Sequence, residues 1–124
     1  KLKYLDEDNL RRIEIANYYL ENIKQEKIIL PLYDKRLHTS HVFHLFVVRT
    51  DDRENLRLYL SNCKIQALIH YPIAPHKQNA YKEFSHYSLP ITEKIHKEVL
   101  SLPISQVMTD KEVEYVVEMI NKYR

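Results

Sequence analysis

Five side chains suited to binding a ligand lie within one short segment of the chain, residues 69–81. They are His70, Tyr71, His76, Gln78 and Tyr81. Together they offer hydrogen-bond donors and acceptors, aromatic faces and two imidazoles that titrate near neutral pH. Pro72 and Pro75 fix φ and remove two backbone donors, so we expect a stiff, extended loop rather than a helix or a central strand. Binding sites are often carried on such loops.

The spacing of the histidines argues against a metal centre. His41 and His44 are three residues apart in a predicted strand, which points them to opposite faces. His70 and His76 could converge across the loop, but no carboxylate or thiolate lies nearby in the sequence to complete a set of three protein ligands. We therefore predict no metal site.

Nucleophilic and phosphate-loop chemistry is also disfavoured. Cys63 lies at the end of a predicted helix, and no serine has the neighbours of a nucleophile elbow. Lys64, Lys77 and Lys82 have polar neighbours and are expected to be exposed amines rather than Schiff-base lysines. The chain contains no glycine, which excludes the P-loop and the dinucleotide-binding fingerprint. Two interpretations of the loop remain: a surface connection satisfied by backbone and water, or a ligand-binding loop.

Composition limits the class of protein. With 124 residues and no break in composition, the chain is expected to form one domain over residues 1–124. Nineteen Lys and Arg against 17 Asp and Glu leave a net charge of +2, without the basic stripe of a nucleic-acid-binding protein. The lone cysteine favours a reducing, cytoplasmic compartment, and no apolar run reaches the roughly 18 residues of a membrane span. The chain opens without Met in a predicted helix, so we expect a fragment of a longer protein.

Hydrophobic spacing predicts four helices that must position the loop. They cover residues 2–23, the stretch from an N-cap at Asp51 or Asp52 to near Asn62, Pro90 to about Leu100, and the segment after a capping box at Thr109–Glu112. In the third helix, Ile91, Ile95 and Val99 are expected on one apolar stripe. In the last helix the apolar stripe is expected to consist of Val113, Val116, Val117 and Ile120.

The strongest strand signal lies in residues 41–50, which are β-branched and aromatic and apolar on both faces after Val42. We therefore expect a central strand that is covered on both sides. Shorter strands are expected at residues 28–30, 65–70 and 102–104, and residues 34–40 are expected to be a polar connection. This order predicts an α+β fold: a small sandwich with a three- to four-stranded, mostly antiparallel sheet covered by about four helices.

Five short motifs occur in order along nearly the whole chain. They are Arg12-x-x-x-Ala16-x-x-Tyr19, His44-x-Phe46-Val47-Val48-Arg49, Ile65-x-x-x-Ile69-His70-Tyr71-Pro72-x-x-Pro75-His76-x-Gln78-x-Ala80-Tyr81, Leu89-Pro90-x-Thr92-Glu93 and Leu100-Ser101-Leu102-Pro103-Ile104. In this combination they resemble the C-terminal domain of the DegT/DnrJ/EryC1/StrS family, which are sugar aminotransferases that use pyridoxal phosphate. The His-Tyr-Pro loop together with the Leu-Ser-Leu-Pro piece is the specific part of the resemblance.

The resemblance implies a longer, homodimeric parent enzyme, with a large α/β cofactor domain upstream of this small domain of a fold-type I aminotransferase. The upstream domain would carry the lysine that binds the cofactor and most of the phosphate contacts. This chain alone is therefore expected to bind no pyridoxal phosphate, to contain no catalytic residue and to be inactive. The rival interpretation is a stand-alone module that binds a small ligand without catalysis.

The share of the work implied for this chain is to close over the active site and help bind a nucleotide-linked keto sugar, with glutamate as amino donor, in cell-surface polysaccharide or amino-sugar biosynthesis. The positions that match the family's loop are His70, Tyr71, His76, Gln78 and Tyr81. We rank the first two highest because they directly follow a predicted strand. Arg49 and His44, on the matching strand, are expected to have structural roles.

One position departs from the family pattern. The family usually has glycine where this chain has Lys64, just before Ile65. A left-handed exit from the preceding helix would then have to be made by Lys64, Cys63 or Asn62. Of the three, Asn62 tolerates that conformation best.

Overall fold

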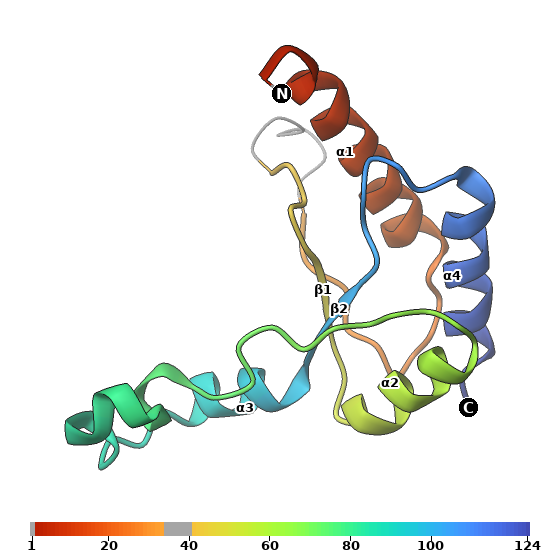
Figure 1. Cartoon of the computed structure of the whole chain (residues 1–124). Helices are drawn as coiled ribbons and strands as arrows, with labels where there is room; N and C mark the ends of the chain where they lie inside the picture. Colours follow the sequence, from red (N-terminus) through yellow and green to blue (C-terminus); the bar gives the residue numbers. More distant parts are fainter. Residues whose placement is uncertain (1, 34–40) are drawn as a thin grey trace.

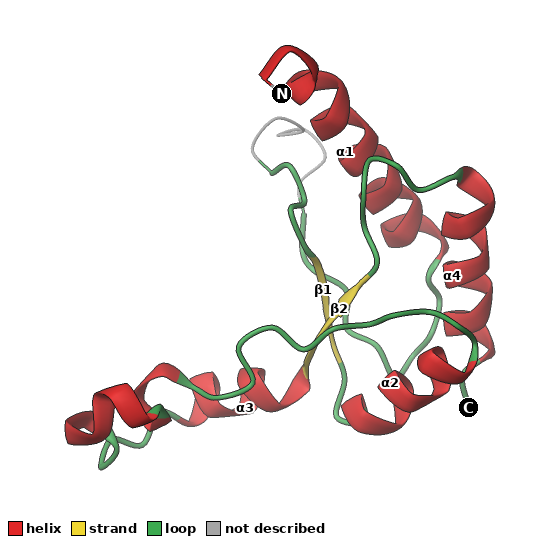
Figure 2. Cartoon of the chain, in the orientation of Figure 1, coloured by secondary structure: helices red, strands yellow, loops and turns green. Residues whose placement is uncertain are grey.

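The computed structural model describes residues 2–33 and 41–124, in which four α-helices, short 3-10 helices (η) and two strands are joined by long connections (Figure 2). In chain order the elements are η1 (Leu2–Tyr4), α1 (Leu5–Asn22), β1 (Phe46–Arg49), α2 (Arg53–Asn62), η3 (Pro75–Lys77), η4 (Asn79–Phe84), α3 (Pro90–Glu98), β2 (Val99–Leu102) and α4 (Asp110–Lys122). The four expected helices are confirmed, but the third ends at Glu98. Val99, which we expected on its apolar stripe, begins β2 instead, and the strand expected at residues 102–104 lies at Val99–Leu102. The expected connection over residues 34–40 lies outside the described residues.

The sheet is small and antiparallel. β1 pairs with β2 over the full length of both strands. One isolated bridge extends each edge, since Ile29 pairs with Arg49 and Leu68 pairs with Ser101. The α+β class and the antiparallel pairing are confirmed, but each outer strand that we expected is reduced to a single bridge. Pro31 limits the first of them because it has no backbone donor.

The core lies on one face of the sheet. Phe46 and Val48 are fully buried, whereas Val47 and Arg49, which point the other way, are half-buried. The ring of Tyr19 meets Phe46 edge-on at 5.1 Å between centroids. The expectation that β1 is covered on both faces is therefore wrong, because α1, α2 and α4 contribute their buried residues to a single cluster on the Phe46 face.

The first and last helices pack side by side (Figure 1) and are joined by hydrogen bonds. The Asn121 amide accepts from the backbone N–H of Lys24 at 2.8 Å and donates to the carbonyl of Asn22 at 2.9 Å. The predicted capping box at the start of α4 is present, with Thr109 and Glu112 each bonding the other's backbone N–H. The predicted apolar stripe of α4 is buried: Val113, Val116, Val117 and Ile120.

The N-cap position of α2 is occupied by Asp52, one of the two residues expected there. Its carboxylate does not cap the backbone of the helix. It accepts instead from the Tyr123 hydroxyl at 2.5 Å and from the Asn55 amide at 2.7 Å. These two bonds, that of Tyr123 first, hold the pKa of Asp52 below its usual value. The carboxylate thus ties the end of the chain to the start of α2.

The exit from α2 is left-handed at Lys64, whose φ is 62°. The backbone N–H of Ile65 donates to the carbonyl of Leu60 at 2.8 Å, and that of Lys64 donates to Ser61 at 2.9 Å, which is a Schellman motif. Lys64 is thus the one of the three candidate residues that takes this conformation, and Asn62 is still helical. Leu60 and Ile65 are both buried, and their packing fixes where the helix must end.

One part of the chain projects away from the rest. We call residues 71–98, which contain η3, η4 and α3, the arm, and the other described residues the body; the arm extends to the lower left of Figure 1. Ile91 is 75% exposed, so its expected place on an apolar stripe facing a core is wrong. The physical reason is that the first turns of α3 lie beyond the sheet, where no element of the body covers them (Figure 1).

Candidate functional site

The predicted loop leaves the edge of the sheet at Leu68, whose backbone exchanges two hydrogen bonds with Ser101. Its first residues, up to Ala74, form no helix, but they are not uniformly extended as we expected, because Tyr71 is left-handed with φ 55°. The later part is not extended either, because η3 begins at Pro75 and η4 follows from Asn79. Proline suits the first position of a helical turn, where no donor is needed. The loop is therefore stiff through short helical turns as well as through its prolines.

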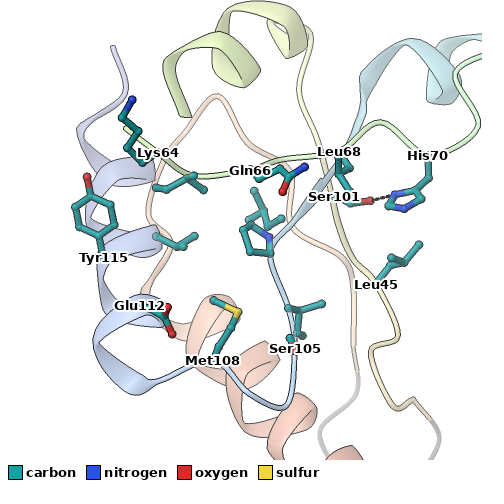
Figure 3. Close-up of a pocket in the computed structure, with 15 residues that line it drawn as sticks. Leu45, Lys64, Gln66, Leu68, His70, Ser101, Ser105, Met108, Glu112 and Tyr115 are labelled. Atoms are coloured by element: carbon teal, nitrogen blue, oxygen red, sulfur yellow. Dashed lines mark hydrogen bonds between the residues drawn. The ribbon is translucent and has the colours of Figure 1, made fainter. Parts of the chain in front are cut away.

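His70 lies where the loop leaves the sheet and is half-buried. Its Nδ1 is hydrogen-bonded to Ser101 Oγ at 2.8 Å, as Figure 3 shows. Its Nε2 has no protein partner among the described residues. The ring is thus oriented by β2 and keeps one nitrogen available for a ligand.

Tyr71 has an unusual backbone. Its φ is 55°, in the left-handed region, and its side chain is 74% exposed. The Tyr71 carbonyl accepts a hydrogen bond from His96 Nδ1 at 2.5 Å. Positive φ is uncommon for a bulky residue, and such strain tends to occur at functional sites. Sequence reasoning missed His96, because it lies 25 positions away on α3 and its contact is to backbone.

His76 is buried, with only 6% of its surface exposed. Its Nε2 is hydrogen-bonded to Glu93 Oε1 of α3 at 2.9 Å. The same carboxylate accepts from the backbone N–H of Leu89 at 3.1 Å. The His76 bond first, and then the Leu89 bond, hold the pKa of Glu93 below its usual value. In this structure the Nε2 atom of His76 anchors the loop to α3.

Gln78 and Tyr81 lie toward the tip of the arm. The Gln78 amide donates to the carbonyl of Ile73 at 3.2 Å, a contact that closes the loop on itself. The Tyr81 ring is near-parallel to Phe84, and Phe84 to Tyr87, at 6.3 and 6.1 Å between centroids. These three rings form an exposed aromatic row on the surface of the arm.

The five predicted residues do not gather in one cavity. His70 lines a cavity of about 490 Å³ between the loop, β2 and α4 (Figure 3). His76 and Tyr81 line a separate cavity of about 480 Å³ on the arm, whose other walls are apolar or aromatic except for Thr92. Tyr71 and Gln78 line neither of them. Whether these five residues bind a ligand stays a prediction.

The first cavity contains polar side chains that sequence reasoning did not assign to a site. They are Lys64, Gln66, Ser101, Ser105, Glu112 and Tyr115. Four of them are already engaged. The Tyr115 hydroxyl donates to the carbonyl of Cys63 at 3.1 Å, and Glu112 caps α4. Ser101 bonds His70, and the Ser105 hydroxyl accepts from the backbone N–H of Val107 at 3.4 Å. Lys64 and Gln66 have no side-chain partner within the described ranges. In the sequence, the only feature that drew attention to this cavity was Lys64, which stands where the family usually has glycine.

Every lysine in residues 2–33 and 41–124 is exposed. Within the same ranges, no three His, Cys, Asp or Glu side chains are grouped so that they could hold a metal ion. No helix among those described is long and apolar enough to cross a membrane.

Arg49 has the structural role that we expected. Its guanidinium donates twice to Glu98 Oε2, from Nη2 at 2.6 Å and from Nε at 3.0 Å. Glu98 is buried at the end of α3, and its backbone carbonyl accepts from Thr50 at 3.1 Å. These contacts fix the base of the arm to β1, and we call them the root of the arm.

Comparison with known proteins identifies the class. The model of the DegT/DnrJ/EryC1/StrS aminotransferase family matches residues 1–121. The chain therefore belongs to this family, as the order of its sequence motifs indicated.

Particular relatives are sugar transaminases. The chain is 58% identical over 125 residues to dTDP-3-amino-3,6-dideoxy-alpha-D-galactopyranose transaminase of Aneurinibacillus thermoaerophilus, which covers 99% of this chain and 33% of that protein. It is 34% identical to dTDP-3-amino-3,4,6-trideoxy-alpha-D-glucose transaminase of Streptomyces venezuelae, with the same coverage.

Solved structures agree with this membership. Streptomyces venezuelae DesV in complex with a ketimine intermediate superposes with a TM-score of 0.89 at 35% identity, covering 98% of this chain and 33% of that chain. Bacillus subtilis NtdA with bound cofactor PMP superposes with a TM-score of 0.85 at 28% identity, covering 97% and 29%. The chain thus spans about a third of the length of these relatives.

Proposed function

We propose that this chain is the C-terminal, substrate-closing domain of a pyridoxal-phosphate-dependent aminotransferase that acts on a nucleotide-linked keto sugar. The observation that carries the proposal is the 58% identity, over 99% of the chain, to a transaminase named for a dTDP-linked amino sugar. The parent protein would be a cytoplasmic homodimer that takes the amino group from glutamate. Its product would serve amino-sugar or cell-surface polysaccharide biosynthesis.

His70 and Tyr71 are the residues that we place against the substrate. With Nδ1 held by Ser101, the free Nε2 of His70 can hydrogen-bond a sugar hydroxyl or a phosphate oxygen. The exposed ring of Tyr71 can pack on a sugar face and exclude water from it. Both side chains follow immediately on a sheet edge, which limits how far they can move.

The other three predicted residues have supporting places in this proposal. His76 keeps the loop on α3, and Gln78 closes the loop through Ile73. Tyr81 is 47% exposed and begins the aromatic row, so its ring remains available to a ligand on the arm. In this proposal the chain's own share is to bind and orient the sugar. The pyridoxal phosphate that takes up the amino nitrogen would be held by the rest of the parent protein.

The experiment uses the whole protein that contains this chain. We expect it to transfer an amino group from glutamate to a dTDP-linked 3-keto-6-deoxyhexose, followed by mass spectrometry of the sugar nucleotide. His70→Ala should raise the KM for the sugar about tenfold, as expected for one lost hydrogen bond to a charged or polar group. His86→Ala, which removes an exposed histidine elsewhere on the arm, is the matched control and should leave the KM unchanged.

Two outcomes would count against the proposal. Equal kinetics for the His70 and His86 variants would remove His70 from the sugar site. An absence of transamination with any nucleotide-linked keto sugar would overturn the function itself and favour a non-catalytic binding module. A simpler check concerns the chain alone, which should add no stoichiometric aldimine band to the absorbance spectrum of free pyridoxal phosphate when the two are mixed.

A further inference from the structure

We propose that His96 is a positioning residue: it holds Tyr71 in its left-handed backbone conformation and thereby sets the direction of the Tyr71 ring toward the sugar. The part of this inference that concerns the sugar rests on the function proposed above. The part that concerns the Tyr71 backbone rests on one contact, the 2.5 Å hydrogen bond from His96 Nδ1 to the Tyr71 carbonyl. Because a carbonyl oxygen only accepts, Nδ1 must carry the proton.

The Tyr71 backbone needs such a partner. A left-handed φ brings Cβ close to the following carbonyl oxygen, which is unfavourable for any residue other than glycine. The next residue, Pro72, has no N–H, so the Tyr71 carbonyl is the only polar group that this peptide unit can use. The residue before a proline is also biased toward extended conformations.

Packing of the Tyr71 side chain cannot supply the restraint. The ring is 74% exposed, so little of its surface is buried against the body or the arm. The strain in the backbone is therefore compensated from the carbonyl side. Among the described residues, His96 provides the hydrogen bond at that carbonyl.

His96 is itself held by the body. Its backbone carbonyl accepts from Arg53 Nη1 at 2.7 Å, and Arg53 is the first residue of α2. Two residues further on, Glu98 is paired with Arg49 of β1. The last turn of α3 is thus fixed at two points, and the imidazole of His96 extends from it to Tyr71. A chain of contacts runs from α2 through His96 to the proposed sugar-facing ring.

Two substitutions separate this role from ordinary packing. His96→Leu removes the donor and keeps comparable bulk. His96→Asn can place an amide N–H near the position of Nδ1, so it should retain the bond. In the 124-residue chain, the ¹³C shift of the Tyr71 carbonyl should move in His96→Leu and return toward the wild-type value in His96→Asn. His86→Leu, on the same arm, should leave it unchanged.

The kinetic test uses the whole protein. We expect His96→Leu to raise the KM for the dTDP-linked keto sugar about tenfold with a smaller change in kcat, and His96→Asn to restore it. In a Tyr71→Ala background the same His96→Leu change should have no further effect, because the ring that it positions is gone. A thermal melt of each variant controls for loss of folding.

The outcomes are distinguishable. An unchanged Tyr71 carbonyl shift in His96→Leu would overturn the positioning role at its structural step. If the Tyr71 carbonyl shift moves in His96→Leu while the KM for the sugar stays constant, the effect on sugar binding is overturned. The same holds if His96→Leu raises the KM equally in the wild-type and Tyr71→Ala backgrounds. A wild-type protein that fails to aminate any keto sugar would instead overturn the proposed function, and the carbonyl shift would still decide the structural step.

Discussion

The body and the arm are held together by different forces. The body encloses a cluster of fully buried side chains that are almost all apolar, with Tyr19 and Phe46 the largest. In the arm only Ala74, His76 and Glu98 are buried, and two of these three are ionisable. The arm keeps its shape through hydrogen bonds to α3, because it has no apolar core of its own. It can therefore turn its aromatic rings outward, which the body cannot do without losing its core.

The largest expected effect tests this difference with one substitution made in both regions. Phe46→Ala removes a ring that is 0% exposed and should lower the free energy of unfolding by about 3–5 kcal/mol. Phe84→Ala removes a ring of the aromatic row and should cost less than about 1 kcal/mol. Urea denaturation followed by circular dichroism measures both. Similar losses would mean that the arm has a core after all.

The second prediction compares an ion pair at the root of the arm with one on the surface. Glu98→Gln weakens the pair with Arg49 and should destabilise the chain by about 2 kcal/mol, because it leaves a partly buried guanidinium poorly paired. Glu118→Gln breaks the exposed pair with Lys122 and should cost at most about 0.5 kcal/mol. Denaturation midpoints of the two variants check this order. A larger loss of stability in Glu118→Gln than in Glu98→Gln would show that the root does not stabilise the attachment of the arm to the body.

The third prediction concerns backbone strain in the body. Lys64→Gly should stabilise the chain by about 1 kcal/mol, because glycine adopts the left-handed conformation without steric cost. Asn62→Gly, two residues earlier and inside α2, should instead destabilise it by roughly 0.5–1 kcal/mol. Differential scanning calorimetry distinguishes the two shifts. If Lys64→Gly were destabilising, the position of the helix exit would be wrong.

The smallest effect is local to the arm and depends on pH. The pKa of Glu93 is lowered by the His76 bond first and then by the Leu89 N–H. A carboxyl with a lowered pKa contributes stability above its unfolded value, near 4.5, and loses it as pH falls through the folded value. The amide proton shift of Leu89 should report this acid transition by NMR.

Glu93→Gln should abolish that transition, while Glu112→Gln should not affect it. Glu112 is a fair control because its pKa is also lowered, but by the capping contacts of Thr109 in the body. A Leu89 shift that responded to both variants would show that the arm and the body unfold together in acid.

Sequence reasoning succeeded where short-range rules decide the structure. The capping box at Thr109 and the apolar stripe of α4 both follow from spacings of three and four residues, and both are present. It failed where the position of other elements decides. Ile91 has helical spacing, but no described element of the body lies over it to bury it.

The candidate site shows the same division. Composition drew attention to a loop that contains an oriented His70 and a left-handed Tyr71. It could not show that His76 is turned inward to Glu93, because the sequence does not distinguish a histidine that faces solvent from one that faces a carboxylate. Nor could it find His96, whose role depends on a backbone carbonyl 25 positions away.

The junction between α3 and β2 has a mechanical consequence. Glu98 ends the helix and Val99 begins the strand, with no residue between them that could act as a hinge. Val99 is both the C-cap of α3 and the first residue of β2, so its backbone angles set the direction in which the arm leaves the sheet. A rotation of the arm about this junction would therefore change the backbone of a residue that is itself paired in the sheet.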